Sequence, residues 1–546
     1  MILTTISRNW FKIAPIVIAS AFFSGCSKDN YKFDNIEIED IKTQVSAPVA
    51  NGKFQLWDFF EGNSNENIKK SESGDIIFTY TENEVIKYDL SELYTFPTSI
   101  PAGDINFDIP AIPYVPGLTI TVPPIEVTEK TPVVTTSTDN SSLQVYEANI
   151  TTGKLKVHLT NPHPSLNADI EMTLIGSTQK TTSGEEELVF NLEATPGVNN
   201  VEFDLNDVTL NFDHEDNADV LPVKIKIQFK GDVNQATDAS KMTLSLHIDD
   251  LVFYSIEANL GKQEINIENQ VVDVDIDALN ELGDGLKFTN PSIEITTKTN
   301  ISAYSILNAN IVGYNTERDP VDLNPAPYHI VTPSKEEGNI LKEGKYIINK
   351  DNSNIVDFIG LPPNEKITFD GKVSINKDLD GNSVEVTRDN PNIIYPDSQF
   401  KADFKMESPL QFEAHNLNYS DTIDLNENIE ELANVKLIFK YEHKLPLNIS
   451  AIAQPYNKSN NTKVGDEITF NLIPSAEVDE EGNPIEMKEG YSYVSLTKKD
   501  IENINNTDAI ILKLTINTPD GKKANLKADL PFNFELATEI GVEVKN

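Results

Sequence analysis

The sequence predicts a mainly β protein composed of tandem β-sandwich domains, and three observations carry this prediction. Apolar and polar residues alternate along most of the chain, turn-forming residues interrupt the alternation, and one strand–turn–strand pattern recurs. The alternation is plain at Val223, Ile225 and Ile227, which are separated by Lys224 and Lys226. Period-two segments bounded by Gly, Asn, Asp or Pro are typical of half-buried strands, and many such strands are typical of sandwiches.

The internal repeat sets the expected division into domains. The strand–turn–strand pattern occurs at residues 153–176, 286–315 and 434–457. In the first and third copies it is followed by a Gly-acid-acid turn and a Phe-Asn-Leu strand. A shared order of motifs over this length is typical of duplicated units. We therefore expect β-sandwich repeats over residues 136–265 and 426–546, with a divergent β-sandwich over residues 266–425.

Composition divides the rest of the chain. We expect a lipoprotein signal peptide over residues 1–25, a tether with a small N-terminal β module over 26–95, and a Pro-rich extended connector over 96–135. Within the last range, Pro110, Pro113 and Pro116 follow one another at every third residue, as in polyproline II. Such a stretch is a semi-rigid spacer; a ligand for a Pro-binding domain is the alternative.

The charge balance narrows the class of partner. The chain has 86 acidic and 44 basic residues, which gives a formal net charge of −42. Nucleic acid is excluded as a partner because backbone phosphates are neutralised by Lys and Arg. Hydrophobic residues make up 39% of the chain, enough for ordinary buried cores. The negative charge fits a self-repelling, soluble surface that attracts cations.

The one cysteine, Cys26, follows a segment with the features of an export signal. Arg8 and Lys12 form a short basic region before an apolar run from Ile13 to Phe23. The run is shorter than the roughly 20 residues that span a bilayer and has the length of a signal-peptide core. The Phe-Ser-Gly-Cys sequence resembles the lipobox of bacterial lipoproteins, with Phe23 where that family usually has an aliphatic residue. The resemblance implies a covalent lipid on Cys26; an ordinary secretory signal is the alternative.

The residues after the cysteine refine the expected location. Ser27, Lys28 and Asp29 resemble the short export signal of surface-exposed lipoproteins of the Bacteroidetes. The resemblance implies a lipid-anchored protein of the outer membrane that faces outward. A periplasm-facing protein, with these residues as a plain polar tether, is the alternative.

Two further stretches resemble uncharacterised multi-domain surface lipoproteins of the Bacteroidetes. They are Trp57-Asp58-Phe59-Phe60 and residues 352–376. The repeated segments, with an Asn-Pro step after the strand in the first copy, resemble the water-stress (late-embryogenesis-abundant) β-sandwich domain. These resemblances imply immunoglobulin-like or water-stress-like sandwiches and supply no catalytic residues.

No motif for catalysis is present in the sequence. The chain lacks HxH, HExxH, a P-loop, a dinucleotide-binding glycine motif and the G-x-S-x-G elbow. With a single cysteine, a structural zinc site is not expected. The seven histidines are interpreted as surface or strand residues: His158, His163, His214, His247, His329, His415 and His443. A glycoside hydrolase needs only two carboxylates, so an enzyme of that class remains the minor alternative.

One acidic turn is a candidate calcium site. Asn376, Asp378 and Asp380 place oxygen ligands at alternate positions before a glycine, as a calcium loop does at its start. The twelfth position is Thr387 rather than a bidentate Glu. The alternative is a hairpin turn, because Asp-Gly between two strands is a common hairpin sequence.

Glycans are the other ligand class considered. Trp57 is the only tryptophan after the signal peptide, so sugar stacking would depend on tyrosines, of which Tyr304, Tyr314 and Tyr395 are candidates. Thr422 lies in an Asp-Thr-Ile sequence that resembles the O-glycosylation pattern of the Bacteroidetes.

The sequence therefore predicts a lipid-anchored structural or binding module, with the membrane as one partner and surface glycans or envelope proteins as others. A glycan-binding accessory lipoprotein of a polysaccharide-uptake system is the alternative.

Overall fold

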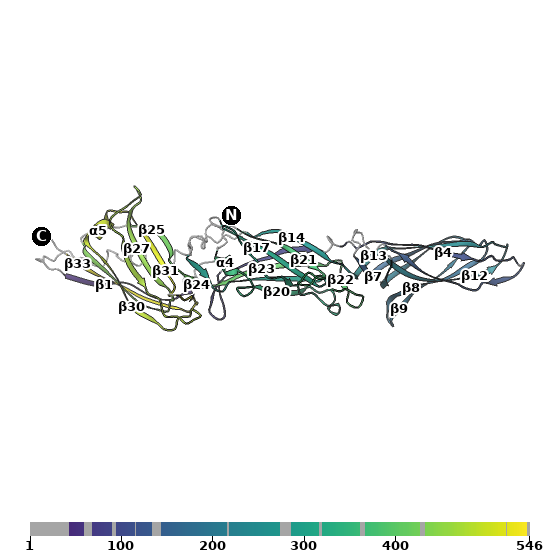
Figure 1. The fold of residues 1–546 in the computed structure, drawn as a ribbon, viewed down its shortest axis with the longest axis horizontal. Helices are drawn as coiled ribbons and strands as arrows, with labels where there is room; N and C mark the ends of the chain where they lie inside the picture. Colours follow the sequence, from purple (N-terminus) through teal and green to yellow (C-terminus); the bar gives the residue numbers. More distant parts are fainter. Residues whose placement is uncertain are drawn as a thin grey trace.

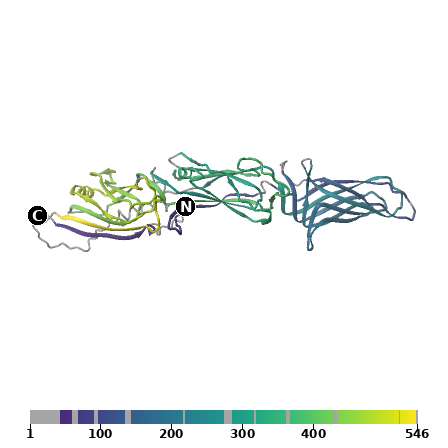
Figure 2. The same ribbon diagram turned by 60° about the horizontal axis from the view of Figure 1, so that its bottom comes forward.

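The computed structural model describes residues 43–58, 68–89, 94, 96–114, 116–133, 143–215, 218–272, 285–315, 319–360, 366–425, 432–519 and 521–542. Strands make up most of these residues and form several sheets, which confirms the mainly β sandwich prediction. The predicted signal peptide lies outside the described residues. Figures 1 and 2 show an elongated molecule with three successive sandwich units. We call them the base unit (43–57 and 417–542), the middle unit (68–89 and 263–414) and the distal unit (96–260).

The distal unit is one large sheet folded over so that its two halves pack together. Its strands are β4 (Ile100–Ile109), β5 (Thr119–Thr121), β6 (Ile125–Pro132), β7 (Gln144–Asn161), β8 (Asn167–Thr181), β9 (Gly184–Ala194), β10 (Gly197–Asn211), β11 (Asp213–Glu215), β12 (Ala218–Asp232) and β13 (Ser240–Asn259). One half has the order β4-β13-β7-β10, and the other contains β6, β12, β8 and β9. The halves are continuous where β10 pairs with β8 at Val208 and Thr209.

The middle unit is a sandwich of two five-stranded sheets. The first contains β2 (Ile68–Lys70), β3 (Ile76–Asp89), β23 (Gln399–Pro409), β16 (Ser292–Thr299) and β20 (Lys342–Ile348). The second contains β14 (Gln263–Val272), β21 (Lys366–Ile375), β17 (Ser305–Tyr314), β18 (Val321–Leu323) and β19 (Tyr328–His329). A short helix, α4 (Ile355–Gly360), and a 3₁₀ turn, η4 (Lys335–Glu337), complete the unit. β22 (Asn392–Ile394) leaves it to pair with β13 of the distal unit.

The base unit packs a four-stranded sheet on a five-stranded one. The first has the order β1 (Thr43–Gln55), β33 (Pro531–Val542), β26 (Leu432–His443) and β30 (Lys488–Leu496). The second contains β25 (Leu417–Asp424), β31 (Ala509–Asn517), β27 (Asn448–Asn457), β28 (Thr462–Lys463) and β29 (Ile468–Ile473), and α5 (Lys498–Asn505) lies between β30 and β31 in the chain. A small sheet of β15 (Leu286–Phe288), β24 (Gln411–Ala414) and β32 (Ala524–Asn525) joins the base and middle units.

All three units share one strand order. In each, the first long strand (β4, β3 or β1) pairs with the last (β13, β23 or β33). The second (β6, β14 or β25) pairs with β12, β21 or β31. Two consecutive strands then follow: β7 and β8, β16 and β17, or β26 and β27. The first of each pair lies beside the last strand of its unit, β13, β23 or β33. The second lies in the opposite half, beside β12, β21 or β31.

The shared order reveals a nested insertion. The chain forms β1 of the base unit, then β2 and β3 of the middle unit, then the whole distal unit, and returns through the middle unit to the base unit. Each unit is therefore inserted between the first and second strands of the one before it. In the distal unit the equivalent connection holds no further domain. Its described residues are 110–114 and 116–118, which we call the apical loop, at the end opposite the base unit (Figures 1 and 2).

These pairings differ from the expectation for the first 135 residues. Instead of forming a small N-terminal module, β1 pairs along its length with β33, and β3 pairs with β23. The expected Pro-rich connector contains β4 and β6, which pair with β13 and β12. The physical reason is that alternation shows that a segment is a strand with one buried face, whereas its partner is chosen by tertiary packing over hundreds of residues.

The cores follow the alternation. Val223, Ile225 and Ile227 of β12 are almost completely buried, as their spacing predicts. One continuous apolar cluster extends through the distal and middle units and includes Leu417, Leu526, Ala528 and Leu530 of the base unit. The base unit also has two smaller clusters of its own. Among the described residues, no helix has the length and apolarity needed to cross a membrane.

Candidate functional site

The predicted lipidation and export residues lie before the first described strand. Cys26, Ser27, Lys28 and Asp29 are outside the described residues, so the lipid anchor stays a prediction. The strand that follows them, β1, begins at Thr43 opposite Val542 of β33.

The predicted calcium ligands lie in a turn of the middle unit. The side-chain amide and backbone N–H of Asn382 bond to the carboxylate of Asp378, and with the N–H of Asp380 they lower the pKa of Asp378. Asn376 is buried and donates from Nδ2 to the carbonyl of Gly261 at 2.8 Å. Within the described part of the chain, no group of three or more His, Cys, Asp or Glu side chains could hold a metal ion. Calcium binding at this turn stays a prediction.

The remaining sequence candidates are dispersed over the molecule. Tyr304 contacts the ring of His329 at 4.4 Å between centroids, and Tyr314 lies under the Lys366 ammonium, while Tyr395 is buried. Trp57 packs against the large apolar cluster rather than forming an exposed platform. Thr422 is exposed on β25, and its glycosylation stays a prediction. The structure does not bring the three candidate tyrosines together.

Two histidines occupy equivalent corners. His163 follows β7 and His443 ends β26, where the chain crosses to the opposite sheet. The Nδ1 atom of His163 accepts N–H groups of Ser165 and Leu166, and that of His443 accepts the N–H of Leu445 at 3.0 Å. Burial lowers the pKa of both rings, that of His443 to about 4. Both are therefore neutral structural residues at neutral pH.

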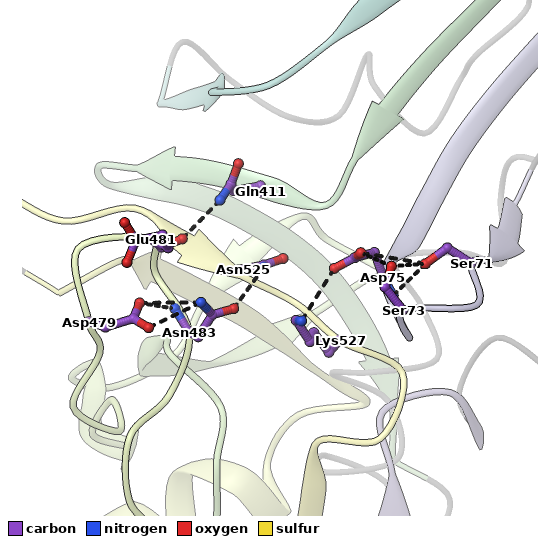
Figure 3. Close-up of polar contacts among 9 residues, drawn as sticks. All are labelled: Ser71, Ser73, Asp75, Gln411, Asp479, Glu481, Asn483, Asn525 and Lys527. Carbon is purple, nitrogen blue, oxygen red and sulfur yellow. Dashed lines mark hydrogen bonds and ion pairs between the residues drawn. The ribbon is translucent and has the colours of Figure 1, made fainter.

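A polar network joins the base and middle units (Figure 3). The turn at residues 479–483 is closed by the Asp479 carboxylate, which accepts the Asn483 N–H at 2.8 Å. From this turn, the Glu481 carbonyl accepts the Gln411 side chain at 2.8 Å, and the Asn483 side chain accepts the Asn525 amide at 2.9 Å.

The same junction contains an ion pair and two strand-like contacts. Lys527 of the base unit lies 3.7 Å from the Asp75 carboxylate of the middle unit, which also accepts the Ser73 hydroxyl (Figure 3). Backbone hydrogen bonds connect Leu526 to Leu410 and Ala528 to Gly74. Side chains and backbone together fix the base unit against the middle unit.

A second junction fixes the distal unit. Arg388 of the middle unit donates from Nη1 to the Asn211 side chain at 2.9 Å and from Nη2 to the carbonyl of Phe212. Its guanidinium also lies 5.5 Å from the centre of the Tyr146 ring. With β22 paired to β13, these contacts make the middle and distal units one continuous structure.

The apical loop is the surface farthest from the base unit. Its three prolines fix φ at positions 110, 113 and 116, and Ile112 is buried and bridged to Thr237. Tyr114 and Leu118 of this loop have 48% and 46% of their surface exposed. Apolar groups held in this way form a preorganised contact point.

A second exposed aromatic group was missed by the sequence interpretation. Tyr491 and Tyr493 of β30 are 56% and 52% exposed, with ring centroids 6.5 Å apart and planes inclined by 11°. The signal was present in the sequence Tyr-Ser-Tyr, because residues two apart in a strand share a face. Which face is open depends on the sheet pairing, which the sequence does not reveal.

Comparisons with known proteins add little to this geometry. No protein-family model matches the chain, and no curated protein matches it. A solved structure provisionally described as a secreted protein of Parabacteroides distasonis is 15% identical over 52% of this chain and 83% of its own, with a TM-score of 0.33. A structure of infectious bursal disease virus is 9% identical over 88% of this chain and 82% of its own, with a TM-score of 0.13. Such TM-scores do not establish a shared fold, so function is inferred from the chain's own residues.

Proposed function

We propose that this protein is a lipid-anchored module of the outer membrane that projects the apical loop away from the cell as a binding surface for a glycan or an envelope protein. The observation that carries the proposal is the nested topology. It returns the chain to the base unit, where Thr43 pairs with Val542, and leaves the apical loop at the opposite end of the rod.

The dimensions support a projecting role. The last long strands of the distal, middle and base units are β13, β23 and β33, with 20, 11 and 12 residues. At about 3.3 Å per residue they span roughly 140 Å together. The segment from Cys26 to Thr43 reaches no more than about 60 Å even when fully extended. An anchor at Cys26 would therefore hold the base unit near the membrane.

Thiol labelling of intact cells tests the location and the orientation. Because Cys26 is the only cysteine and is expected to be acylated, a Leu118→Cys variant offers one new thiol at the apical loop. A membrane-impermeant maleimide should label this variant on intact cells as strongly as in lysed cells. Labelling only after lysis would show that the loop faces the periplasm.

The anchor is tested separately with a Cys26→Ala variant. Loss of the acylation point should move the protein from the membrane fraction to the soluble fraction while its fold is retained. A Cys26→Ala protein that stays in the membrane fraction would contradict the lipid anchor. The unmodified chain is the control in both experiments.

Glycan binding is the second candidate function. The exposed pair Tyr491 and Tyr493 favours it, because two exposed, nearly parallel aromatic rings offer the apolar surface on which sugar rings stack.

A further inference from the structure

The outer face of the four-stranded base sheet carries an apolar strip that runs across the strands. Tyr493 of β30 lies opposite Ile438 of β26, which lies opposite Ala537 of β33, which in turn lies opposite Pro48 of β1. Directly paired residues of antiparallel strands share a face, so these four side chains form one row. Tyr491 lies two residues before Tyr493 and widens the row at its β30 end. We call these five residues the tyrosine strip.

The strip is open and its rings are oriented. Both tyrosines have more than half of their surface exposed, and Ile438 and Ala537 are half-buried beside them. The two rings are nearly parallel, and the Nζ of Lys436 lies 4.5 Å from the centre of the Tyr493 ring. Neither phenol hydroxyl has a hydrogen-bond partner among the described residues. Two polar groups are therefore presented at the edge of an apolar surface.

Ion pairs border the strip on both sides. Lys440 and Glu535 lie on the next row of the sheet, 3.2 Å apart, and Lys436 and Glu539 lie on the row beyond Tyr493, 3.8 Å apart. Each pair is neutral as a whole and offers both donors and acceptors of hydrogen bonds. The net charge of −42 disfavours an acidic ligand anywhere on the surface. The border therefore suits a ligand that is uncharged and rich in hydroxyl groups.

We propose that the tyrosine strip binds a chain of neutral hexopyranose units. The C–H face of one sugar ring packs on the part of the Tyr493 ring that Lys436 leaves free and that of the next on Tyr491. The sugar hydroxyls bond to the bordering Lys and Glu side chains. An apolar floor with a few polar groups at its edge is the usual composition of a small-molecule site. A flat, exposed strip without a closed pocket suits a polymer rather than a single sugar. The inference deepens the glycan-binding candidate function and does not depend on the apical loop.

The test uses the purified full-length protein on an array of neutral and acidic oligosaccharides that includes cellohexaose, mannohexaose and oligogalacturonate. We expect retention on at least one neutral hexasaccharide, and a Tyr491→Ala/Tyr493→Ala variant should bind it at least tenfold more weakly, as expected for the loss of stacked rings. A Tyr491→Phe/Tyr493→Phe variant keeps the rings and should retain most of the affinity.

Tyr254→Ala is the matched control, because Tyr254 is also 56% exposed but lies on β13 of the distal unit. It should bind as the unmodified protein does, and circular dichroism establishes that all variants are folded. Binding to no neutral glycan at about 1 mM, preference for oligogalacturonate, or an equal loss in Tyr254→Ala would each overturn the proposal. Because binding is measured on purified protein, its failure is distinguishable from failure of the thiol-labelling experiment, which concerns location.

Discussion

His443 shows how a single buried side chain can set the acid sensitivity of a unit. It is fully buried at the end of β26, its Nδ1 accepts a backbone N–H, and its ring lies between those of Tyr441 and Phe532. Burial, together with the nearby charge of Lys488, lowers its pKa from 6.5 to about 4. The native base unit therefore holds a neutral histidine that the unfolded chain would protonate near pH 6.5.

We expect the base unit to lose stability on acidification. Below pH 6.5 the His443 side chain is protonated in the unfolded state, whereas in the native state it stays neutral down to about pH 4. The free energy of unfolding therefore falls as the pH is lowered through this window. At pH 5 the loss is about 2 kcal/mol. This loss is measured by urea unfolding at pH 7 and pH 5, with amide exchange in β26 and β33 as the probe of the base unit.

A His443→Gln variant should remove this part of the pH dependence, whatever its own stability at pH 7. The exposed His158 offers the control, since His158→Gln should retain the full loss between pH 7 and pH 5. An unchanged pH dependence in His443→Gln would contradict the assignment.

Arg388 is the residue on which the alignment of the distal unit depends. It connects the turn before β22 to Asn211 and Phe212 across the junction. We expect Arg388→Ala to weaken the junction by about 2 kcal/mol, the usual contribution of a charged hydrogen-bond donor. Small-angle scattering should show a wider distribution of molecular lengths, and amide exchange in β22 should accelerate.

The control at this position is Arg388→Lys. Lysine keeps the charge but cannot reproduce the planar fork of the guanidinium. The spread of molecular lengths and the amide exchange rate in β22 should therefore lie between those of the wild type and of Arg388→Ala. Unchanged scattering in Arg388→Ala would mean that β22 and the apolar core hold the junction without it.

At the scale of elements, alternation predicted the strands and their buried faces but not their partners. The buried positions of β12 follow directly from its sequence. The exposed positions of Tyr491 and Tyr493 follow from theirs only when the sheet pairing has shown which face of β30 is open to solvent. The partners of β1 and β3 lie hundreds of residues away, and no local pattern encodes them. Local chemistry therefore predicted the fold class, while the nested topology and the tyrosine strip needed the three-dimensional pairing.

The turn at residues 479–483 depends on Gly482, a position that tolerates few other residues. Gly482 has φ of +86°, and a Cβ there would lie 2.6 Å from the carbonyl oxygen of Lys523. Gly482→Ala should therefore displace the turn and break its contacts with Gln411 and Asn525. We expect a loss of about 2–3 kcal/mol in thermal unfolding of the base unit, combining backbone strain with lost hydrogen bonds.

Gly521 of the base unit separates the two contributions. Its φ of +68° is also in the left-handed region, but no atom lies within 4 Å of its Cβ position. Gly521→Ala should lose only about 1 kcal/mol. Equal losses in the two variants would show that the contact with Lys523 is unimportant.

At the scale of the whole molecule, nesting makes the distal unit removable. The chain leaves the middle unit after Asp89 and returns at Gln263, and both β3 and β14 belong to the middle unit. Replacing residues 94–260 by a short turn should leave a folded protein. The middle unit should be less stable, because it shares its core with the distal unit. The base unit should change least, because most of its buried residues lie in two clusters of its own.

Deleting residues 43–55 is the contrasting change. It removes β1 and leaves β33 without one of its two partners, so the base unit alone should be destabilised. Calorimetry of both proteins distinguishes the units. A base unit that melts early when the distal unit is removed would contradict the independence of its cores.

The pairing of β1 with β33 also fixes the order in which the molecule is completed. β1 is among the first strands to be synthesised, yet its partner is the last. The distal unit is encoded in one uninterrupted stretch and can close as soon as β13 has emerged, the middle unit must wait for β23, and the base unit must wait for β33. This order would allow the units to close from the tip towards the base, with β1 lacking its partner until β33 has been made. An open strand edge is a site of aggregation, so the end that is made first is also the end that needs the longest protection.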